Sequence, residues 1–496
     1  MKNKIIIIGG GPGGYTAAIK AARLGADVTL VESGKLGGIC LNEGCIPTKA
    51  LLRTATHFRS AVANDVPGVT ISGAQLDWPA AQDRKESIIR TLTKGVASTL
   101  RRNEVAMLSG IAELLPEKTV GVGGEMLKAD SIILATGSRC PSGLFNGEEL
   151  PCVIDTSQAL MLDEVPKSLL IVGGGVIGVE FSTLFNALGT DVSIVELMPR
   201  LLPSMDEDIS EFIQASLESK GVRIYTGTRL ESLKILRGSP HATLVAADAA
   251  GFASPGSPAS PGVPASPGSP ASPGAPASPG APASLGVPGS PGSPASPGAP
   301  ASVRAEKILI AAGRTVNTTI KGADKIIKTP NGAFATDENY MTNIPGIYAI
   351  GDCNGKAMLA HAAMAQGESV AAHIMGQQAH INNNIVPSCV YSSPEIASVG
   401  LTEAQLIARG VEYKNSVYNI SANARSMIEG SEGFIKILSD NKYGELLGAH
   451  IIAPYATEMI AEVALCMSME GSVEDIAATI HAHPTVSESI RDALFA

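Results

Sequence analysis

Two glycine-rich strand–helix–strand patterns constrain the fold more than any other feature of this sequence. In each, a short apolar run leads into a glycine cluster of the form G-x-G-x-x-G, then a helical stretch, then a second apolar run ending in a glutamate. The first glycine and the closing glutamate are 23 residues apart in both. Two complete units with equal spacing predict two dinucleotide sites. The glycines and acids are Gly9, Gly11, Gly14 and Glu32 in the first unit, and Gly173, Gly175, Gly178 and Glu196 in the second.

Each residue type has a physical role at its place in the unit. The first glycine permits the tight turn, the second lets a pyrophosphate approach the backbone, and the third lets helix and strand pack closely. Free N–H groups and a partial positive charge at the start of the helix attract the phosphates. A carboxylate at the strand end accepts hydrogen bonds from a ribose and repels a 2′-phosphate. We therefore expect Glu196 to favour NAD over NADP, with Arg200 as the nearest opposing charge.

The order of the predicted elements indicates an α/β protein with three parts. Further apolar runs that end in tight glycine turns lie at 131–135, 307–312 and 346–350, and are typical of parallel strands. From about Ile385 the pattern changes to short alternating strands and helices. We predict two Rossmann-like dinucleotide-binding domains and an α+β C-terminal domain. The predicted boundaries are 1–150 continued by 314–385 for the first domain, 151–313 for the second and 386–496 for the third.

A Ser/Pro/Gly/Ala repeat interrupts the second domain at 254–301. Proline at nearly every third place favours polyproline II, whereas glycine is too sparse for a collagen helix. The repeat lies between a strand-like stretch at 242–247 and the strand that begins at Lys307, so we expect these two strands to form a hairpin with the repeat as its tip. A tolerated surface insertion is the favoured interpretation, because lengthening a loop costs little free energy. A spacer or docking segment is the alternative.

The charge balance and hydropathy argue against two classes of partner. Lys and Arg total 37 and Asp and Glu total 47, which gives a net charge of −10. Nucleic acid and anionic membrane surfaces require clustered positive charge. No apolar run approaches the roughly 18 residues of a membrane span. We expect no nucleic-acid partner, no membrane association and a cytoplasmic location.

Cys40 and Cys45 form the most informative local motif. Two cysteines five apart can bridge if the intervening chain starts a helix, and a thiolate at a helix N-terminus has a lowered pKa. A metal pair or two buried cysteines are the alternatives. A metal site would need further ligands nearby, so we predict no metal. The odd count of seven cysteines excludes a fully paired disulfide scaffold and by itself favours a reactive thiol or a metal site.

His483 is a candidate base near the C-terminal end. Glu488 follows five residues later, and Pro484 fixes the local turn. A carboxylate can orient an imidazole and raise its basicity, as deprotonation of a thiol requires. A lone histidine is more often structural, so the local sequence leaves both interpretations open.

Taken together, these motifs resemble those of the flavin-dependent disulfide reductases. The resemblance is carried by Cys40-Leu-Asn-Glu-Gly-Cys45 with Lys49, by Gly351-Asp352 and by His483-Pro-Thr with Glu488, and it covers the chain apart from the repeat. Leu-Asn between the cysteines and the stretch 358–362 resemble the branch that acts on dihydrolipoamide. Ile39 and Glu43 depart from the family pattern, and Glu43 adds a charge that opposes thiolate formation.

The resemblance implies a role for each candidate residue. FAD would be bound by the first unit, with Asp352 at the ribityl chain, Lys49 at the flavin ring and Gly137 in a turn against the cofactor. NAD would be bound by the second unit, with Gly313 in a turn and Glu180 near the nicotinamide, paired with Lys49. The implied catalytic residues are Cys40, Cys45, His483 and Glu488.

The implied activity is oxidation of protein-bound dihydrolipoamide, with NAD reduced through a Cys40–Cys45 disulfide and FAD. The implied partner is the lipoyl domain of a 2-oxo acid dehydrogenase complex or a glycine cleavage lipoyl carrier protein. The C-terminal domain would form a homodimer in which His483 serves the other subunit. A glutathione-, mercuric- or CoA-disulfide reductase is the near alternative. A scaffold or adhesive protein that acts through the proline-rich arm is the distant one.

Overall fold

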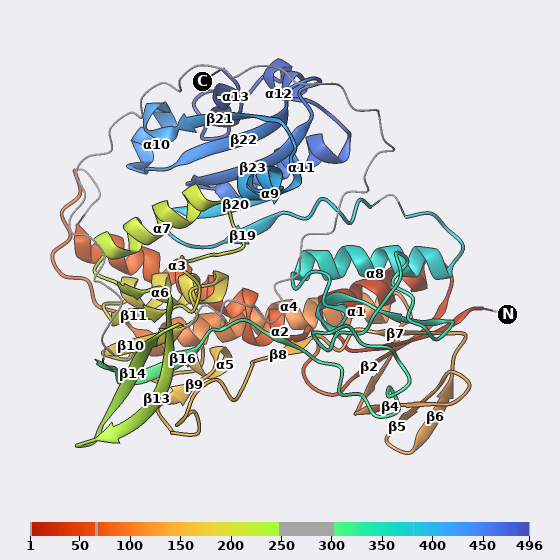
Figure 1. Ribbon diagram of the computed structural model, residues 1–496. Helices are drawn as coiled ribbons and strands as arrows, with labels where there is room; N and C mark the ends of the chain where they lie inside the picture. Colours follow the sequence, from red (N-terminus) through yellow and green to blue (C-terminus); the bar gives the residue numbers. More distant parts are fainter. Residues whose placement is uncertain (1, 65–67, 248–301, 380, 496) are drawn as a thin grey trace.

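The computed structural model describes residues 2–64, 68–247, 302–379 and 381–495. Three sheet-containing regions make up the molecule, with the C-terminal region placed over the other two (Figure 1). The repeat at 254–301, and the polyproline II conformation expected for it, lie outside the described residues.

The first region is built on a five-stranded parallel sheet with the order β18-β7-β1-β2-β3. The central strand is buried along Ile5 to Ile8 because helices cover the sheet, which explains its unbroken apolar run. Strand β18 comes from far along the chain and joins the sheet beside β7. The bounds are β1 Lys4–Ile8, β2 Asp27–Glu32, β3 Ala106–Ser109, β7 Ser131–Leu134 and β18 Ile347–Ala349.

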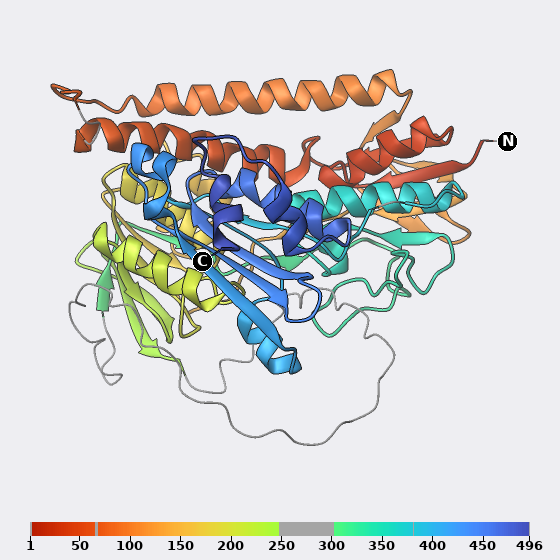
Figure 2. The same ribbon diagram turned by 90° about the horizontal axis from the view of Figure 1, so that it is seen from above.

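Helices and a small meander surround this sheet. Helices α1 and α8 pack against each other, and α3 and α4 lie side by side along one side of the molecule (Figure 2). The long helix α3 also packs on α6 of the second region, so one helix links two sheets. The bounds are α1 Pro12–Arg23, α2 Gly38–Glu43, α3 Cys45–Ala63, α4 Trp78–Arg102, α8 Ala360–Ile374, β4 Ala112–Leu115, β5 Thr119–Val122, β6 Glu125–Lys128 and the 3₁₀ turn η2 Gly351–Asn354.

The second region repeats the design with a five-stranded parallel sheet of order β12-β11-β10-β16-β9. A two-stranded ribbon, β17 with β8, lies at the crossing between the regions. The bounds are β8 Ser138–Arg139, β9 Val153–Ile154, α5 Thr156–Ala159, β10 Ser168–Val172, α6 Val176–Ala187, β11 Asp191–Val195, α7 Glu207–Ser219, β12 Arg223–Tyr225, β16 Lys307–Ile310 and β17 Thr315–Val316.

The prediction that 242–247 forms a hairpin with the strand at Lys307 is wrong, because a different strand pairs with 242–247. A three-residue strand, β15 (Ser302–Arg304), pairs antiparallel with β14 (Ser239–Ala246), which also pairs with β13 (Thr228–Leu236). Strand β16 instead enters the parallel sheet beside β10. Its apolar residues are buried because it lies inside that sheet, whereas a hairpin arm keeps one face in solvent.

The third region is an antiparallel sheet of order β19-β20-β23-β22-β21, covered by short helices (Figure 1). The α+β prediction for the C-terminal part is confirmed. The bounds are β19 Ser388–Val390, β20 Glu395–Gly400, α9 Glu403–Arg409, β21 Tyr413–Asn419, η3 Ile420–Ala422, α10 Ala424–Glu429, β22 Phe434–Asp440, β23 Leu446–Ala453, α11 Ala456–Ser468, α12 Val473–Ala478 and α13 Glu488–Ala493.

Within the described ranges, we find no helix with the length and apolar character needed to cross a bilayer.

Candidate active site

The two glycine turns have nearly identical geometry. Gly9 and Gly173 adopt φ values of +109° and +112°, which side chains other than glycine rarely tolerate. A Cβ on Gly14 would lie 1.8 Å from the Gly9 carbonyl oxygen, and a Cβ on Gly178 would lie 1.9 Å from that of Gly173. The first glycine is therefore required for the turn, and the third for contact between helix and strand.

The middle glycines face open space. A Cβ on Gly11 would meet only Gly38 Cα at 3.9 Å, and a Cβ on Gly175 would meet nothing within 4 Å. Each lies immediately before a helix, α1 or α6, whose first N–H groups lack partners within the helix. These residues fit the phosphates of a dinucleotide.

Glu32 braces the first turn from the end of β2. Its carboxylate accepts the Gly10 N–H at 2.6 Å and the Gly34 N–H at 2.6 Å. Glu32 also lines the cavity described below, so it lies where a ribose hydroxyl would reach it.

Glu196 repeats this arrangement in the second unit. It accepts the N–H of Gly174 and, at 2.7 Å, that of Met198. Arg200, the expected opposing charge, lies 3.6 Å from Glu207 and donates to two carbonyl oxygens of its own loop. Its guanidinium is thereby engaged within the loop, which favours a free 2′-hydroxyl at Glu196.

A cavity of about 810 Å³ lies between the first glycine turn and the cysteine motif. Most residues predicted to bind FAD line it, together with both cysteines. Gly14 does not, because it packs against β1. The predicted residues at the cavity are Gly9, Gly11, Glu32, Cys40, Cys45, Lys49, Gly137, Glu180 and Asp352.

Cys40 and Cys45 lie together because the chain turns between two helices. Cys40 is in α2, Gly44 breaks the helix, and Cys45 is the first residue of α3. A hydrogen bond from Cys40, together with the nearby Lys49 ammonium, lowers the pKa of Cys45 to about 7 against the effect of burial. The same hydrogen bond, and then burial, raise the pKa of Cys40. Above a pH of about 7 the pair therefore holds one proton, on Cys40, and Cys45 is the thiolate. No disulfide joins the two cysteines in this structure.

Lys49 and Glu180 form an ion pair across two regions. Lys49 Nζ lies 2.8 and 2.7 Å from the two carboxylate oxygens, and the Glu180 side chain is only 6% exposed. Tyr391 from the C-terminal region donates its backbone N–H to Glu180 Oε1 at 3.0 Å. Its ring lies beneath the ammonium, 4.5 Å from Nζ to the ring centre. The predicted pairing is present, and Tyr391 was not predicted.

Asp352 is held by two residues that sequence reasoning missed. The Ser138 hydroxyl donates to its carboxylate, and Arg314 Nε donates to the Ser138 hydroxyl oxygen at 2.6 Å. Gly137 and Gly313, with φ values of +72° and +81°, immediately precede these two residues. The sequence could have indicated Ser138 and Arg314, because each is a polar residue that directly follows a predicted glycine turn.

His483 and Glu488 lie together, but apart from the cavity. Nδ1 of His483 is 2.9 Å from Glu488 Oε1, and the Thr485 N–H donates to Glu488 Oε2 at 2.7 Å. Burial raises the pKa of Glu488, but the hydrogen bonds from His483 and Thr485 outweigh it and lower the pKa overall. The His483 side chain is 72% exposed. The neighbouring His481 pairs with Glu462 at 2.7 Å.

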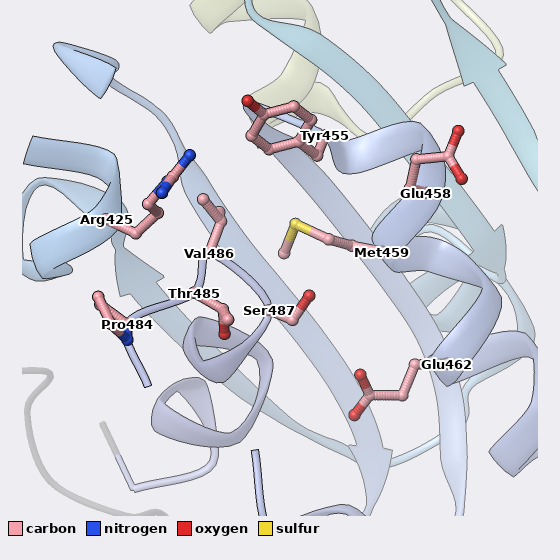
Figure 3. A pocket seen from close by; sticks show the side chains of 9 residues that line it. All are labelled: Arg425, Tyr455, Glu458, Met459, Glu462, Pro484, Thr485, Val486 and Ser487. Atoms are coloured by element: carbon pink, nitrogen blue, oxygen red, sulfur yellow. The ribbon is translucent and has the colours of Figure 1, made fainter. Parts of the chain in front are cut away.

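A second hollow, of about 380 Å³, lies beside this histidine loop. Figure 3 shows it between α11 on one side and the loop from Pro484 to Ser487 on the other, with Arg425 of α10 at its rim. Met459 points from α11 across the hollow toward the loop.

A buried charge cluster outside the cavity was also missed. Lys436 Nζ lies among three carboxylates, 2.8 Å from Asp206, 2.7 Å from Asp208 and 2.5 Å from Glu403. These acids are close enough together to suggest a cation site, but the lysine ammonium supplies the positive charge. The cluster ties α7 to the C-terminal sheet.

Comparison with known proteins agrees with this geometry. Residues 3–249 and 294–367 match the family described as pyridine nucleotide-disulphide oxidoreductase, and residues 386–494 match its dimerisation domain. The chain is 35% identical over its full length, and over 90% of the relative, to "Dihydrolipoyl dehydrogenase 1, mitochondrial" of Arabidopsis thaliana. It is 34% identical to "Dihydrolipoyl dehydrogenase" of Bacillus subtilis, covering 99% of this chain and 97% of that protein.

Solved structures share the fold. LpdA from Mycobacterium tuberculosis superposes with a TM-score of 0.80 at 24% identity, covering 99% of this chain and 98% of the other.

Proposed function

The chain belongs to the pyridine nucleotide-disulphide oxidoreductase family, and from this membership we propose that it oxidises protein-bound dihydrolipoamide to lipoamide with FAD and NAD. The single observation that carries the proposal is the unequal thiol pair. Cys45 has a lowered pKa, Cys40 a raised one, and both line one cavity with Lys49 and Glu180. Relatives of similar length carry the name dihydrolipoyl dehydrogenase.

The residues present fit both cofactors. Gly9, Gly11, Gly14 and Glu32 would hold the adenosine diphosphate part of FAD, with Gly137, Asp352 and Lys49 along the rest of the cavity. Gly173, Gly175, Gly178 and Glu196 would hold NAD, with Gly313 and Glu180 toward the nicotinamide. When bound, FAD would supply a two-electron acceptor and NAD would supply the final hydride acceptor.

The cysteines and His483 carry the exchange of thiols for a disulfide. The reaction starts with Cys40 and Cys45 joined as a disulfide. His483 of the second subunit, whose imidazole is oriented by Glu488, accepts a proton from one substrate thiol. The thiolate formed attacks Cys40, the Cys40–Cys45 bond breaks and Cys45 leaves as a thiolate. The low pKa of Cys45 makes it the better leaving group.

The second substrate thiol completes the exchange. Its sulfur attacks the substrate sulfur of the mixed disulfide and closes the lipoamide ring; Cys40 leaves and takes up the proton that the second substrate thiol gives off. The substrate has then lost two electrons and the cysteine pair has gained two. Cys40 is the interchange thiol and Cys45 the thiolate at the cofactor.

The remaining parts of the proposal concern organisation. The chain carries a dimerisation domain. We assign FAD binding to 1–150 with 314–385, NAD binding to 151–313 and dimer formation to 386–496. The partner would be the lipoyl domain of a 2-oxo acid dehydrogenase complex or a glycine cleavage lipoyl carrier protein, in the cytoplasm.

The test is NADH formation from dihydrolipoamide and NAD by the purified flavoprotein. Cys40→Ser and Cys45→Ser should each reduce the rate by at least about a thousandfold, because the disulfide cannot form. Cys152→Ser is the matched control, since Cys152 does not line the cavity, and it should retain the rate.

Two results would contradict the proposal. One is a protein that binds no flavin. The other is a protein that reduces glutathione disulfide or CoA disulfide with NADPH faster than it oxidises dihydrolipoamide.

A further inference from the structure

We propose that Tyr391 is a positioning residue for the redox site: its ring and backbone N–H hold the Lys49–Glu180 pair, so that the C-terminal domain controls the reactivity of Cys45. The inference deepens the proposed function and rests on it, because it takes Cys45 as the working thiolate. Its basis is the meeting of three regions of the chain at one ion pair.

The contacts of Tyr391 reach both members of the pair. Its backbone N–H donates to Glu180 Oε1 at 3.0 Å, and its ring centre lies 4.5 Å from Lys49 Nζ. Residues 389 and 391 both line the redox cavity, while Val390 between them is fully buried on the opposite face. Tyr391 directly follows β19, and the alternation of side chains along that strand, continued by one residue, directs Tyr391 toward the ion pair.

Lys49 needs such support because its side chain is long. It is 30% exposed, and the rotamer entropy of a free lysine side chain opposes any fixed position of the ammonium. Glu180 binds the ammonium on one side, and the negative face of the tyrosine ring attracts it on another. Burial raises the pKa of Tyr391 to about 12, so the phenol stays neutral and adds no charge of its own.

The position of this ammonium matters to the thiolate. Lys49 lies one turn after Cys45 on α3. The ionisable groups that act on the pKa of Cys45 are Cys40 on α2, Lys49 and Glu180. Tyr15 on α1 also lies near the pair, and both cysteines raise its pKa. Lys49 lowers the pKa of Cys45 and Glu180 raises it. If the Lys49 ammonium moves toward solvent while the Glu180 carboxylate stays in place, the pKa of Cys45 rises.

The experiment measures the reactivity of Cys45 against pH. The holoprotein is reduced with dithiothreitol and treated with iodoacetamide, and mass spectrometry with fragmentation assigns the label to Cys45 or Cys40. Tyr391→Leu removes the ring and keeps the backbone N–H, whereas Tyr391→Phe keeps both. Tyr443→Leu is the matched control, because the exposed Tyr443 ring lies 4.6 Å from Lys442 on the same domain.

We expect Tyr391→Leu to raise the midpoint of the Cys45 profile by roughly half a unit and to slow alkylation at low pH about threefold. Tyr391→Phe and Tyr443→Leu should match the unchanged protein. In a Lys49→Met background, Tyr391→Leu should have no further effect, since it acts through the lysine. Tyr391→Met serves as a second ring-less variant should leucine pack badly.

An unchanged midpoint in the ring-less variants, or an equal shift in Tyr391→Phe, would overturn the inference. So would a shift that persists when Lys49 is absent. The assay uses neither dihydrolipoamide nor NAD, so its outcome is separate from the test of the proposed function.

Discussion

At the scale of single residues, the most demanding environment belongs to Lys436. Its side chain and that of Asp206 are each 1% exposed, so both charges have left water and depend on one another. His450, also buried, lies 3.9 Å from Asp206, and burial lowers its pKa, so it stays neutral beside the pair. Lys436 of β22 therefore holds the start of α7, which carries Asp206 and Asp208, against the C-terminal sheet.

Replacing Lys436 with methionine should lower the free energy of unfolding by about 3–5 kcal/mol, because it leaves a buried carboxylate without its partner. Urea unfolding at pH 7 measures the loss. Lys321→Met is the matched control: its pair with Glu113 is exposed, so it should cost no more than about 1 kcal/mol. An equal loss in both variants would contradict the argument.

The same cluster has a defined pH dependence. Burial raises the pKa of Asp206 and of Glu403, but hydrogen bonds from Lys436 outweigh it and lower both pKa values overall, from usual values of 3.8 and 4.5. Groups with lowered pKa stabilise the fold above their unfolded pKa and lose that contribution as pH falls. The difference in free energy of unfolding between Lys436→Met and the unchanged protein should therefore be constant above a pH of about 4.5, and urea unfolding should show it narrowing as pH falls further, through the lowered pKa values of the two acids.

Residues whose chemistry is local could be predicted from their motifs, whereas the Lys49–Glu180 pair, 131 positions apart, was predicted only through the family resemblance. Cys40, Cys45 and Lys49 fall within ten positions, and His483 stands five from Glu488. Lys436 and Asp206 are 230 positions apart, and Tyr391 and Glu180 are 211 apart. No local pattern marks such pairs, because they form only when separate domains pack together.

At the scale of elements, the glycine turns decide where helices meet strands. The two predicted strand–helix–strand units are confirmed, as β1–α1–β2 and β10–α6–β11. The helices begin at Pro12 and Val176, directly after the middle glycine of each unit. The hairpin was mispredicted because β15 has three residues, too few for a periodic signal.

Gly178→Ala tests the contact between α6 and β10. The new Cβ would lie 1.9 Å from the Gly173 carbonyl oxygen, so the helix must move, and overpacking of this kind costs about 1–3 kcal/mol. Gly95→Ala in α4 is the control: its Cβ would meet nothing within 4 Å, and alanine should stabilise the helix by about 0.5–1 kcal/mol. Guanidinium unfolding of both variants should give opposite signs, and a stable Gly178→Ala would refute the packing argument.

At the scale of the whole molecule, the separation between His483 and the cysteines requires explanation. His483 is largely exposed and is not among the residues that line the cavity of its own chain, yet the proposed reaction needs it at the substrate thiol. The chain carries a dimerisation domain, and we propose that in a two-fold dimer the same loop of a second subunit would lie against the cavity of the first.

Mixing two inactive variants shows whether His483 serves the other subunit or its own chain. Cys45→Ser and His483→Gln homodimers should each be nearly inactive. If His483 serves the other subunit, a heterodimer contains one complete site, and random mixing of equal amounts should restore about a quarter of the full activity. If His483 acts within its own chain, every site in the mixture lacks one group and no activity returns. Refolding the mixture from denaturant and measuring NADH formation decides between them, with the separately refolded homodimers as controls.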